Sequence, residues 1–270
     1  MPLAVNSGAV ISVFRDHRNT KRGEVLMQSI GMTDIGISRQ INQDYIFSSD
    51  TTVGILPNLY IVADGMGGHN AGDFASRFCV EHFIEYIKSV GDKPISLLTC
   101  IEDGIRNTNE QMIVAAAKSP ELMGMGTTFV LATVGEDNVM YTANVGDSRL
   151  YRINKSGITQ ITQDHSLVAE MVKNGDITKD EARFHPKKNV VTRAISATVV
   201  VNPDMFEVVL DKDDIVLMCS DGLSNMLSDA EIFETVSAHR DDLKSLAEKL
   251  IAKANENGGK DNISVILFCV

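Results

Sequence analysis

Apolar residues along the chain fall into short blocks with either strand-like or helix-like spacing. Short apolar or β-branched runs predict strands at 25–31, 45–48, 59–63, 127–134, 139–145, 149–153, 157–161, 204–209, 214–218 and 263–268. Apolar steps of three and four predict helices at 71–90, 95–118, 166–174, 178–182, 228–237 and 241–255. Thr178 is a candidate N-cap, and residues 184–189 have the composition of a loop.

The order of these elements predicts the fold class. Strands come in groups and helices come in pairs, which favours an α+β fold with mostly antiparallel sheets over a doubly wound parallel sheet. The two helical pairs would cover two packed sheets. We expect one domain over residues 25–270 with an inserted segment at about 165–189, preceded by an N-terminal extension or edge element over 1–24.

Composition and charge exclude several classes of protein. The chain has 270 residues, of which 44% are hydrophobic and 23% charged, as in ordinary globular domains. The formal net charge of −11 argues against nonspecific binding to nucleic acid or anionic lipid, because both would be repelled.

The four cysteines lie in apolar stretches without CxxC spacing, so buried free thiols are expected. With no membrane-spanning run and no secretory signal pattern, the expected compartment is the cytoplasm.

Five aspartates occur at turns where predicted strands begin or end: Asp44, Asp64, Asp147, Asp221 and Asp261. A single Asp beside Gly is usually a turn residue, but strand ends can converge on one edge of a sheet. Carboxylates gathered there would need cations to offset their repulsion, and oxygen ligands favour Mg²⁺ or Mn²⁺ over zinc. Two such cations can activate a bridging water for in-line attack on phosphorus, and Arg39 is a candidate to bind the phosphoryl oxygens.

Motifs for competing chemistries are absent from the sequence. There is no GxxxxGK[ST], no GxGxxG that opens a helix after a strand, no HExxH and no GxSxG. The glycines of DGMGG after Asp64 are weak evidence by themselves.

The chain resembles the metal-dependent protein phosphatase 2C family (PPM type) in its bacterial serine/threonine phosphatase form. The resemblance extends from about Thr33 to the C-terminus. Eight segments carry it in the family's order and spacing: TDIGISRQINQD, VADGMGGHNAG, GMGTT, NVGDSRLYR, TQDHSLV, HPKKNVVTRAI, CSDGLSNMLSD and GGKDNISVIL.

This resemblance implies a fold, an activity and a set of site residues. The implied fold is a β-sandwich of two antiparallel sheets flanked by helical pairs, with a flap at about 165–189. The implied activity is hydrolysis of phosphoserine and phosphothreonine in proteins at a centre of two or three Mn²⁺ or Mg²⁺ ions. By position, Asp64 would bridge both ions, and Gly65 would give its main-chain carbonyl to one of them. Asp221 and Asp261 would complete the other ion, and Asp44 would bind metal through water or orient that water. Asp147 would hold a third ion with Asp221, and Arg39 would clamp the substrate phosphate.

The sequence departs from the family pattern at two positions. Gln43 stands where some members have Glu, so one carboxylate is replaced by a neutral amide. Met66 stands where eukaryotic members have a His proposed as general acid, and His69 is close in sequence. The general acid is therefore left unassigned, and a metal-bound water is one alternative.

The sequence disfavours two other classes of function. A protein that kept this fold only as an inert binding module would be expected to have lost some of the metal-binding aspartates, but all five are present. A two-metal phosphodiesterase or nuclease is disfavoured by the acidic charge and the lack of a basic stripe. We expect phosphorylated protein substrates of a serine/threonine kinase, a monomer, and no nucleic-acid or membrane partner. The basic residues of the extension could form a docking arm.

Overall fold

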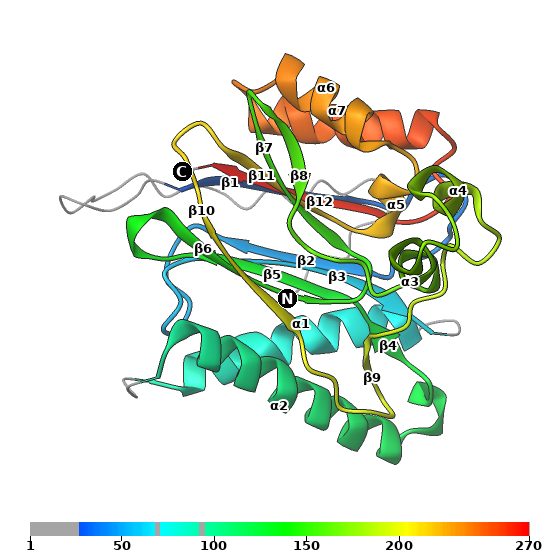
Figure 1. Ribbon diagram of the computed structural model, residues 1–270. Coiled ribbons are helices and arrows are strands. Elements are labelled where there is room, and N and C mark those ends of the chain that lie inside the picture. Colours follow the sequence, from blue (N-terminus) through cyan, green and yellow to red (C-terminus); the bar gives the residue numbers. More distant parts are fainter. Residues whose placement is uncertain (1–26, 68–70, 92–94, 270) are drawn as a thin grey trace.

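The computed structural model describes residues 27–67, 71–91 and 95–269 (Figure 1). The predicted extension over 1–24 and the first two residues of the predicted strand at 25–31 lie outside the described residues. Two antiparallel sheets pack face to face, and a pair of helices covers each outer face (Figure 1). This arrangement confirms the expected α+β sandwich.

The first sheet has the strand order β1-β12-β11-β7-β8. Its strands are β1 (Gln28–Asp34), β7 (Arg149–Asn154), β8 (Gly157–Gln160), β11 (Ile215–Cys219) and β12 (Ile263–Cys269). The helices α6 (Asp229–Ala238) and α7 (Leu243–Glu256) cover its outer face (Figure 1).

The second sheet has the order β10-β6-β5-β3-β4-β9, and β2 pairs with β3. Its strands are β2 (Asp44–Ser49), β3 (Leu59–Met66), β4 (Gly126–Thr127), β5 (Phe129–Val134), β6 (Val139–Val145), β9 (Ile195–Ser196) and β10 (Asp204–Val209). The helices α1 (Ala71–Ser89) and α2 (Leu97–Lys118) lie on its outer face, and the short 3₁₀ helices η1 (Pro120–Leu122) and η2 (Glu136–Asn138) follow α2 and β5.

Three apolar clusters explain these layers. One lies between the second sheet and α1 with α2, one lies between the first sheet and α6 with α7, and one lies between the sheets. In the last, the rings of Tyr60 and Phe268 stack with centroids 4.2 Å apart. All six residues of β5 are buried because apolar layers cover both of its faces.

Side-chain caps set the beginnings of several helices. Thr178 caps α4 (Lys179–Phe184) in a capping box with Glu181, as the sequence predicts, and Ser228 with Glu231 does the same for α6. Each predicted range for these helices therefore includes the cap, and the helix proper begins one residue later.

The structure also differs from the predicted elements at β1, at α5 and at β4. The strand predicted at 25–31 extends to Asp34, because its partner β12 continues the pairing as far as Ile263. The short helix α5 (Asp221–Ser224) replaces the turn predicted after β11, and its four residues are too few to show helical periodicity. The run predicted as one strand at 127–134 is divided into β4 and β5, since Gly126 and Thr127 pair with the distant β9.

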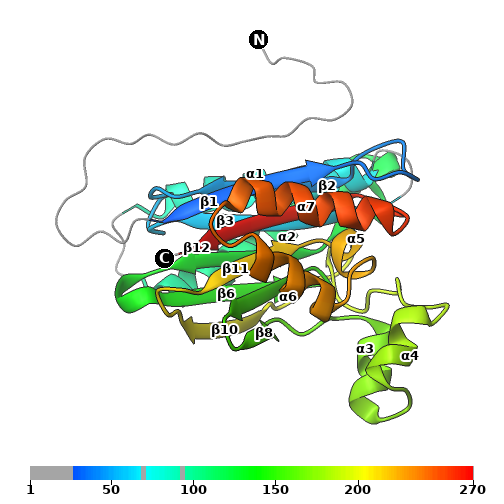
Figure 2. The same ribbon diagram turned by 90° about the horizontal axis from the view of Figure 1, so that it is seen from above.

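A helical segment lies beside the sandwich at the end that carries α5. It comprises α3 (Leu167–Asn174), α4 and the loop that follows them, and we call residues 165–189 the flap. The flap projects from the body of the molecule (Figure 2). Among the described residues, no helix combines the length and the apolar composition that a bilayer span needs.

Candidate active site

Two aspartates face each other at the end of a strand pair. Strand β2 begins at Asp44 and pairs antiparallel with β3, in a register that places Asp44 directly opposite Asp64. Like charges at directly opposite positions destabilise a sheet. This register therefore favours binding of a positive ion between or beside the two carboxylates.

Two more aspartates reach the same place from the other sheet. Asp221 is the first residue of α5 and follows β11 closely, and Asp261 comes shortly before β12. The hydroxyl groups of Ser220 and Ser264, from these same segments, each donate to Asp44 Oδ2 at 2.7 Å. The acidic group thus lies at the seam between the two sheets.

The carboxylates of this group are not satisfied by the protein alone. Among the described residues, Asp44 Oδ1 and Asp221 Oδ1 are buried without a hydrogen-bond partner. Burial, with the charges of Asp221 and Asp261, raises the pKa of Asp44 to about 7, although the bonds from Ser264 and Ser220 lower it. Burial and then the charge of Asp44 raise the pKa of Asp64 well above its ordinary value.

The pKa of Asp221 is raised to about 6, first by burial and then by the charge of Asp261. Such mutual repulsion among oxygen ligands is relieved when a divalent cation binds. The donor set therefore fits Mg²⁺ or Mn²⁺ and contains no soft ligand that would favour other metals.

Arg39 lies at the rim of this acidic group. Its Nη2 donates to Asp261 Oδ2 at 2.7 Å, and its side chain is 47% exposed. The bond to Asp261, opposed by partial burial, raises the pKa of the Arg39 guanidinium. Asp221 Oδ2 accepts a bond from Asn225. Among the described residues, no three acidic, His or Cys side chains form a group that could hold a metal ion by themselves.

Gly65 is held where only a glycine fits. A Cβ at this position would lie 2.0 Å from the carbonyl oxygen of Gly72 and 2.6 Å from that of Gln43. The Gly65 N–H also donates to the Gln43 carbonyl at 3.0 Å. The main chain after Asp64 is therefore fixed against both the entry to β2 and the start of α1.

Asp147 joins the group from the loop between β6 and β7. It is buried, and burial followed by the charge of Asp221 raises its pKa to about 8. The preceding Gly146 has φ of 110°, and a Cβ there would lie 2.6 Å from the Thr128 side chain. His165 fixes the same loop, since its Nδ1 accepts from the Gly146 N–H at 3.0 Å and its Nε2 contacts Asp204.

The structure also reveals positioning residues that the sequence reasoning did not single out. Thr128 Oγ1 accepts from the Asp64 N–H at 2.9 Å, and Asn262 Oδ1 accepts from the Gln43 N–H at 2.8 Å. The hydroxyls of Ser220 and Ser264 belong to the same set. All four lie inside segments that carry the resemblance, and Ser220 and Asn262 adjoin Asp221 and Asp261 in the sequence, which is the signal that could have found them. His69 lies outside the described residues.

Comparisons with known proteins identify the family of this chain. The family model described as "Protein phosphatase 2C" matches residues 37–267. The chain is 39% identical over 243 residues to the serine/threonine phosphatase stp of Listeria innocua, covering 87% of this chain and 92% of that protein.

Solved structures give the same result. The serine/threonine phosphatase Stp1 of Staphylococcus aureus superposes with a TM-score of 0.83 at 33% identity, covering 95% of this chain and 99% of that one. The catalytic domain of the serine/threonine protein phosphatase PstP, solved with two manganese ions, gives a TM-score of 0.78 at 29% identity and covers 90% and 97%.

Proposed function

The chain belongs to the protein phosphatase 2C family and is a metal-dependent protein-serine/threonine phosphatase, and on this premise we propose how its own residues divide the work. Its substrates are phosphorylated proteins, and its cofactors are Mn²⁺ or Mg²⁺ ions. When bound, these ions lower the pKa of water and balance charge on the phosphoryl oxygens.

The observation that carries the proposal is the register of β2 against β3. It places two carboxylates, Asp44 and Asp64, opposite each other at the seam where Asp221 also has an oxygen without a partner in the described part of the chain. A structural role alone would favour pairing these carboxylates with cationic side chains, as occurs elsewhere in the molecule.

We assign the ligand roles from these positions. Asp64 lies centrally and would be shared by two ions, with the Gly65 carbonyl beside it. Asp221 and Asp261 would complete one ion. Asp44, whose Oδ2 accepts from both serine hydroxyls, would act through water or orient that water. Asp147, whose pKa responds to the charge of Asp221, would hold a third ion with it.

Arg39 is proposed to bind the substrate phosphate. Its half-exposed guanidinium donates through Nη2 to Asp261 Oδ2 at 2.7 Å. A guanidinium free of that bond, as it would be if Asp261 held an ion, can donate two parallel bonds to phosphoryl oxygens. The general acid remains unassigned, since Met66 cannot donate a proton.

We also propose the source of the substrates, the oligomeric state and the cellular location. The expected substrates are products of a serine/threonine kinase, and the expected state is a monomer with one phosphatase domain over 25–270. A cytoplasmic location is supported by the free cysteines, of which three are buried.

The decisive experiment measures phosphate release from a phosphothreonine peptide and from a small phosphate ester, with and without Mn²⁺. We expect metal-dependent release by the wild type that collapses in Asp221→Asn. Asp137→Asn is a matched control, because Asp137 is exposed and its φ of 56° suits Asn equally well. Folded wild-type protein that releases no phosphate at saturating Mn²⁺ would refute the proposal.

A further inference from the structure

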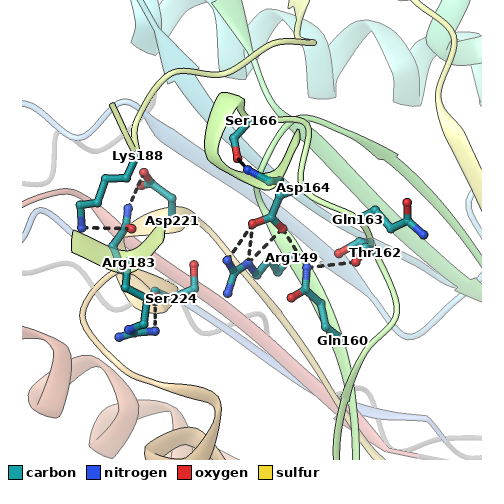
Figure 3. Close-up of polar contacts among 12 residues, drawn as sticks. Arg149, Gln160, Thr162, Gln163, Asp164, Ser166, Arg183, Lys188, Asp221 and Ser224 are labelled. Atoms are coloured by element: carbon teal, nitrogen blue, oxygen red, sulfur yellow. Dashed lines mark hydrogen bonds and ion pairs between the residues drawn. The ribbon is translucent and has the colours of Figure 1, made fainter. Parts of the chain in front are cut away.

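The flap is bonded to the segment that begins at Asp221 (Figure 3). Arg183 of α4 donates through Nη1 to the carbonyl oxygens of Ser224 and Leu227, both at 3.4 Å. Lys188 Nζ, in the loop after α4, donates to Asn225 Oδ1 at 3.3 Å. Asn225 Nδ2 in turn donates to Asp221 Oδ2 at 2.8 Å.

This chain of bonds has only one consistent orientation. The Lys188 ammonium has donors only, and a carboxylate has acceptors only. The Asn225 amide between them must therefore turn its oxygen to Lys188 and its NH₂ group to Asp221. Lys188 thereby fixes the amide, and the amide holds Oδ2 of the carboxylate.

The consequence falls on the other oxygen of Asp221. With Oδ2 held by Asn225, Oδ1 is left buried and without a hydrogen-bond partner among the described residues. If the amide rotated, its oxygen would face the carboxylate, and Asp221 would turn to find another donor. An outer hydrogen bond of this kind orients a metal ligand.

We propose that Lys188 is a positioning residue of the metal site, acting from the flap through Asn225 to orient Asp221 for metal binding. The inference rests on the ligand role assigned to Asp221 above. It assigns the flap a function in metal affinity, in addition to any contact with substrate.

A simple electrostatic role for Lys188 predicts the opposite result. A positive side chain near a cation site repels the cation, so removal of the charge would then tighten Mn²⁺ binding. A substrate-binding role predicts a change in KM with unchanged Mn²⁺ affinity. When binding is measured at pH 8, where the Asp221 carboxyl is ionised with or without the Lys188 charge, only the positioning role predicts weaker Mn²⁺ binding on removal of that charge.

The test is calorimetric titration of metal-free full-length protein with Mn²⁺. We expect Lys188→Met to weaken binding on the order of tenfold. Its exposed neighbour Lys187 is the matched control, and Lys187→Met is expected to change the Kd less than about twofold. Asn225→Leu should cause a loss similar to that of Lys188→Met, and the double variant should lose no more than either, because both act along one path.

The outcomes separate the inference from the function on which it rests. Unchanged or tighter Mn²⁺ binding by both Lys188→Met and Asn225→Leu, while Asp221→Asn loses binding, would overturn the inference and leave the phosphatase assignment intact. Equal binding by wild type and Asp221→Asn would overturn both. Additive losses in the double variant would likewise contradict a single path through the amide.

Discussion

Asp214 and Asp221 lie at the two ends of the same short strand, β11, and their carboxylates have opposite surroundings. Asp214 is fully buried and accepts from Arg152 Nε at 2.5 Å, from Asn154 and from the Asp211 N–H. Asp221 has one oxygen without a partner among the described residues, and burial with the charge of Asp261 raises its pKa to about 6.

The difference separates structural carboxylates from carboxylates that bind ions. At the Asp214 end, Arg152 also pairs with Asp211, and Lys155 pairs with Asp213 at 2.9 Å. The protein itself supplies the positive charges there. At the Asp221 end, Arg39 contacts Asp261, while Asp44 and Asp64 face each other. The latter arrangement is complete only with bound cations.

The largest effect is expected from breaking the buried pair at the structural end. Asp214→Asn leaves the Arg152 guanidinium without its buried partner, and loss of one member of a buried ion pair costs about 3–5 kcal/mol. Urea unfolding should show this loss, while kcat of the folded variant stays within about twofold of wild type. A stability loss below about 1 kcal/mol would show that Asp214 is not a structural carboxylate.

At the Asp221 end of β11, substitution of an aspartate is expected to reduce activity and not stability. Asp64→Asn removes a charge that faces Asp44, so the metal-free protein should be at least as stable as wild type. Phosphatase kcat/KM should fall about 10²–10³-fold, as when one electrostatic contributor to a transition state is removed. Steady-state kinetics and urea unfolding together test both parts. A variant that keeps wild-type activity would contradict the assigned role.

The pH dependence of the metal-free protein sharpens the contrast further. Asp44, Asp147 and Asp221 have pKa values of about 7, 8 and 6 when folded, whereas unfolded aspartates titrate near pH 3.9. The folded state therefore binds more protons, and its stability falls as pH rises from about 5 to 8.

We expect a decrease in the free energy of unfolding of at least about 2 kcal/mol over this range, since one pKa unit corresponds to about 1.4 kcal/mol. Unfolding by urea in the presence of a chelator measures it, and added Mn²⁺ at pH 8 should recover the loss. A flat or rising profile without metal would count against the charge repulsion inferred at this edge.

The smallest effect is expected for the exposed pair at the structural end. Lys155 and Asp213 are 79% and 64% exposed, so Lys155→Ala should leave the unfolding midpoint close to that of wild type. Thermal unfolding in low and high salt would measure it. A change as large as that of Asp214→Asn would mean that pairing matters more than burial at this end of β11.

Much of the fold follows from local sequence patterns. The helices α1–α4, α6 and α7 and most strands agree with the predicted ranges within a few residues, because apolar periodicity and caps such as Thr178 act over short distances along the chain. The short strands β4 and β9 were not predicted as a pair, since Gly126 and Ser196 are distant in sequence and each strand has two residues. The helix α5 was missed for the related reason that one turn has no periodicity.

In the candidate active site, too, some features follow from the sequence and others only from the tertiary structure. The acidic residues and the hard-cation chemistry follow from the sequence by itself, because carboxylates beside glycines at strand ends can be read from the chain. The family follows from the resemblance of eight segments in their order and spacing. Only the tertiary structure decided which carboxylates face each other, that Ser220 and Ser264 hold Asp44 across the seam, and that Lys188 reaches Asp221 through Asn225. These contacts join residues from different elements and often from distant parts of the chain, and the packing of the two sheets and the flap brings them together.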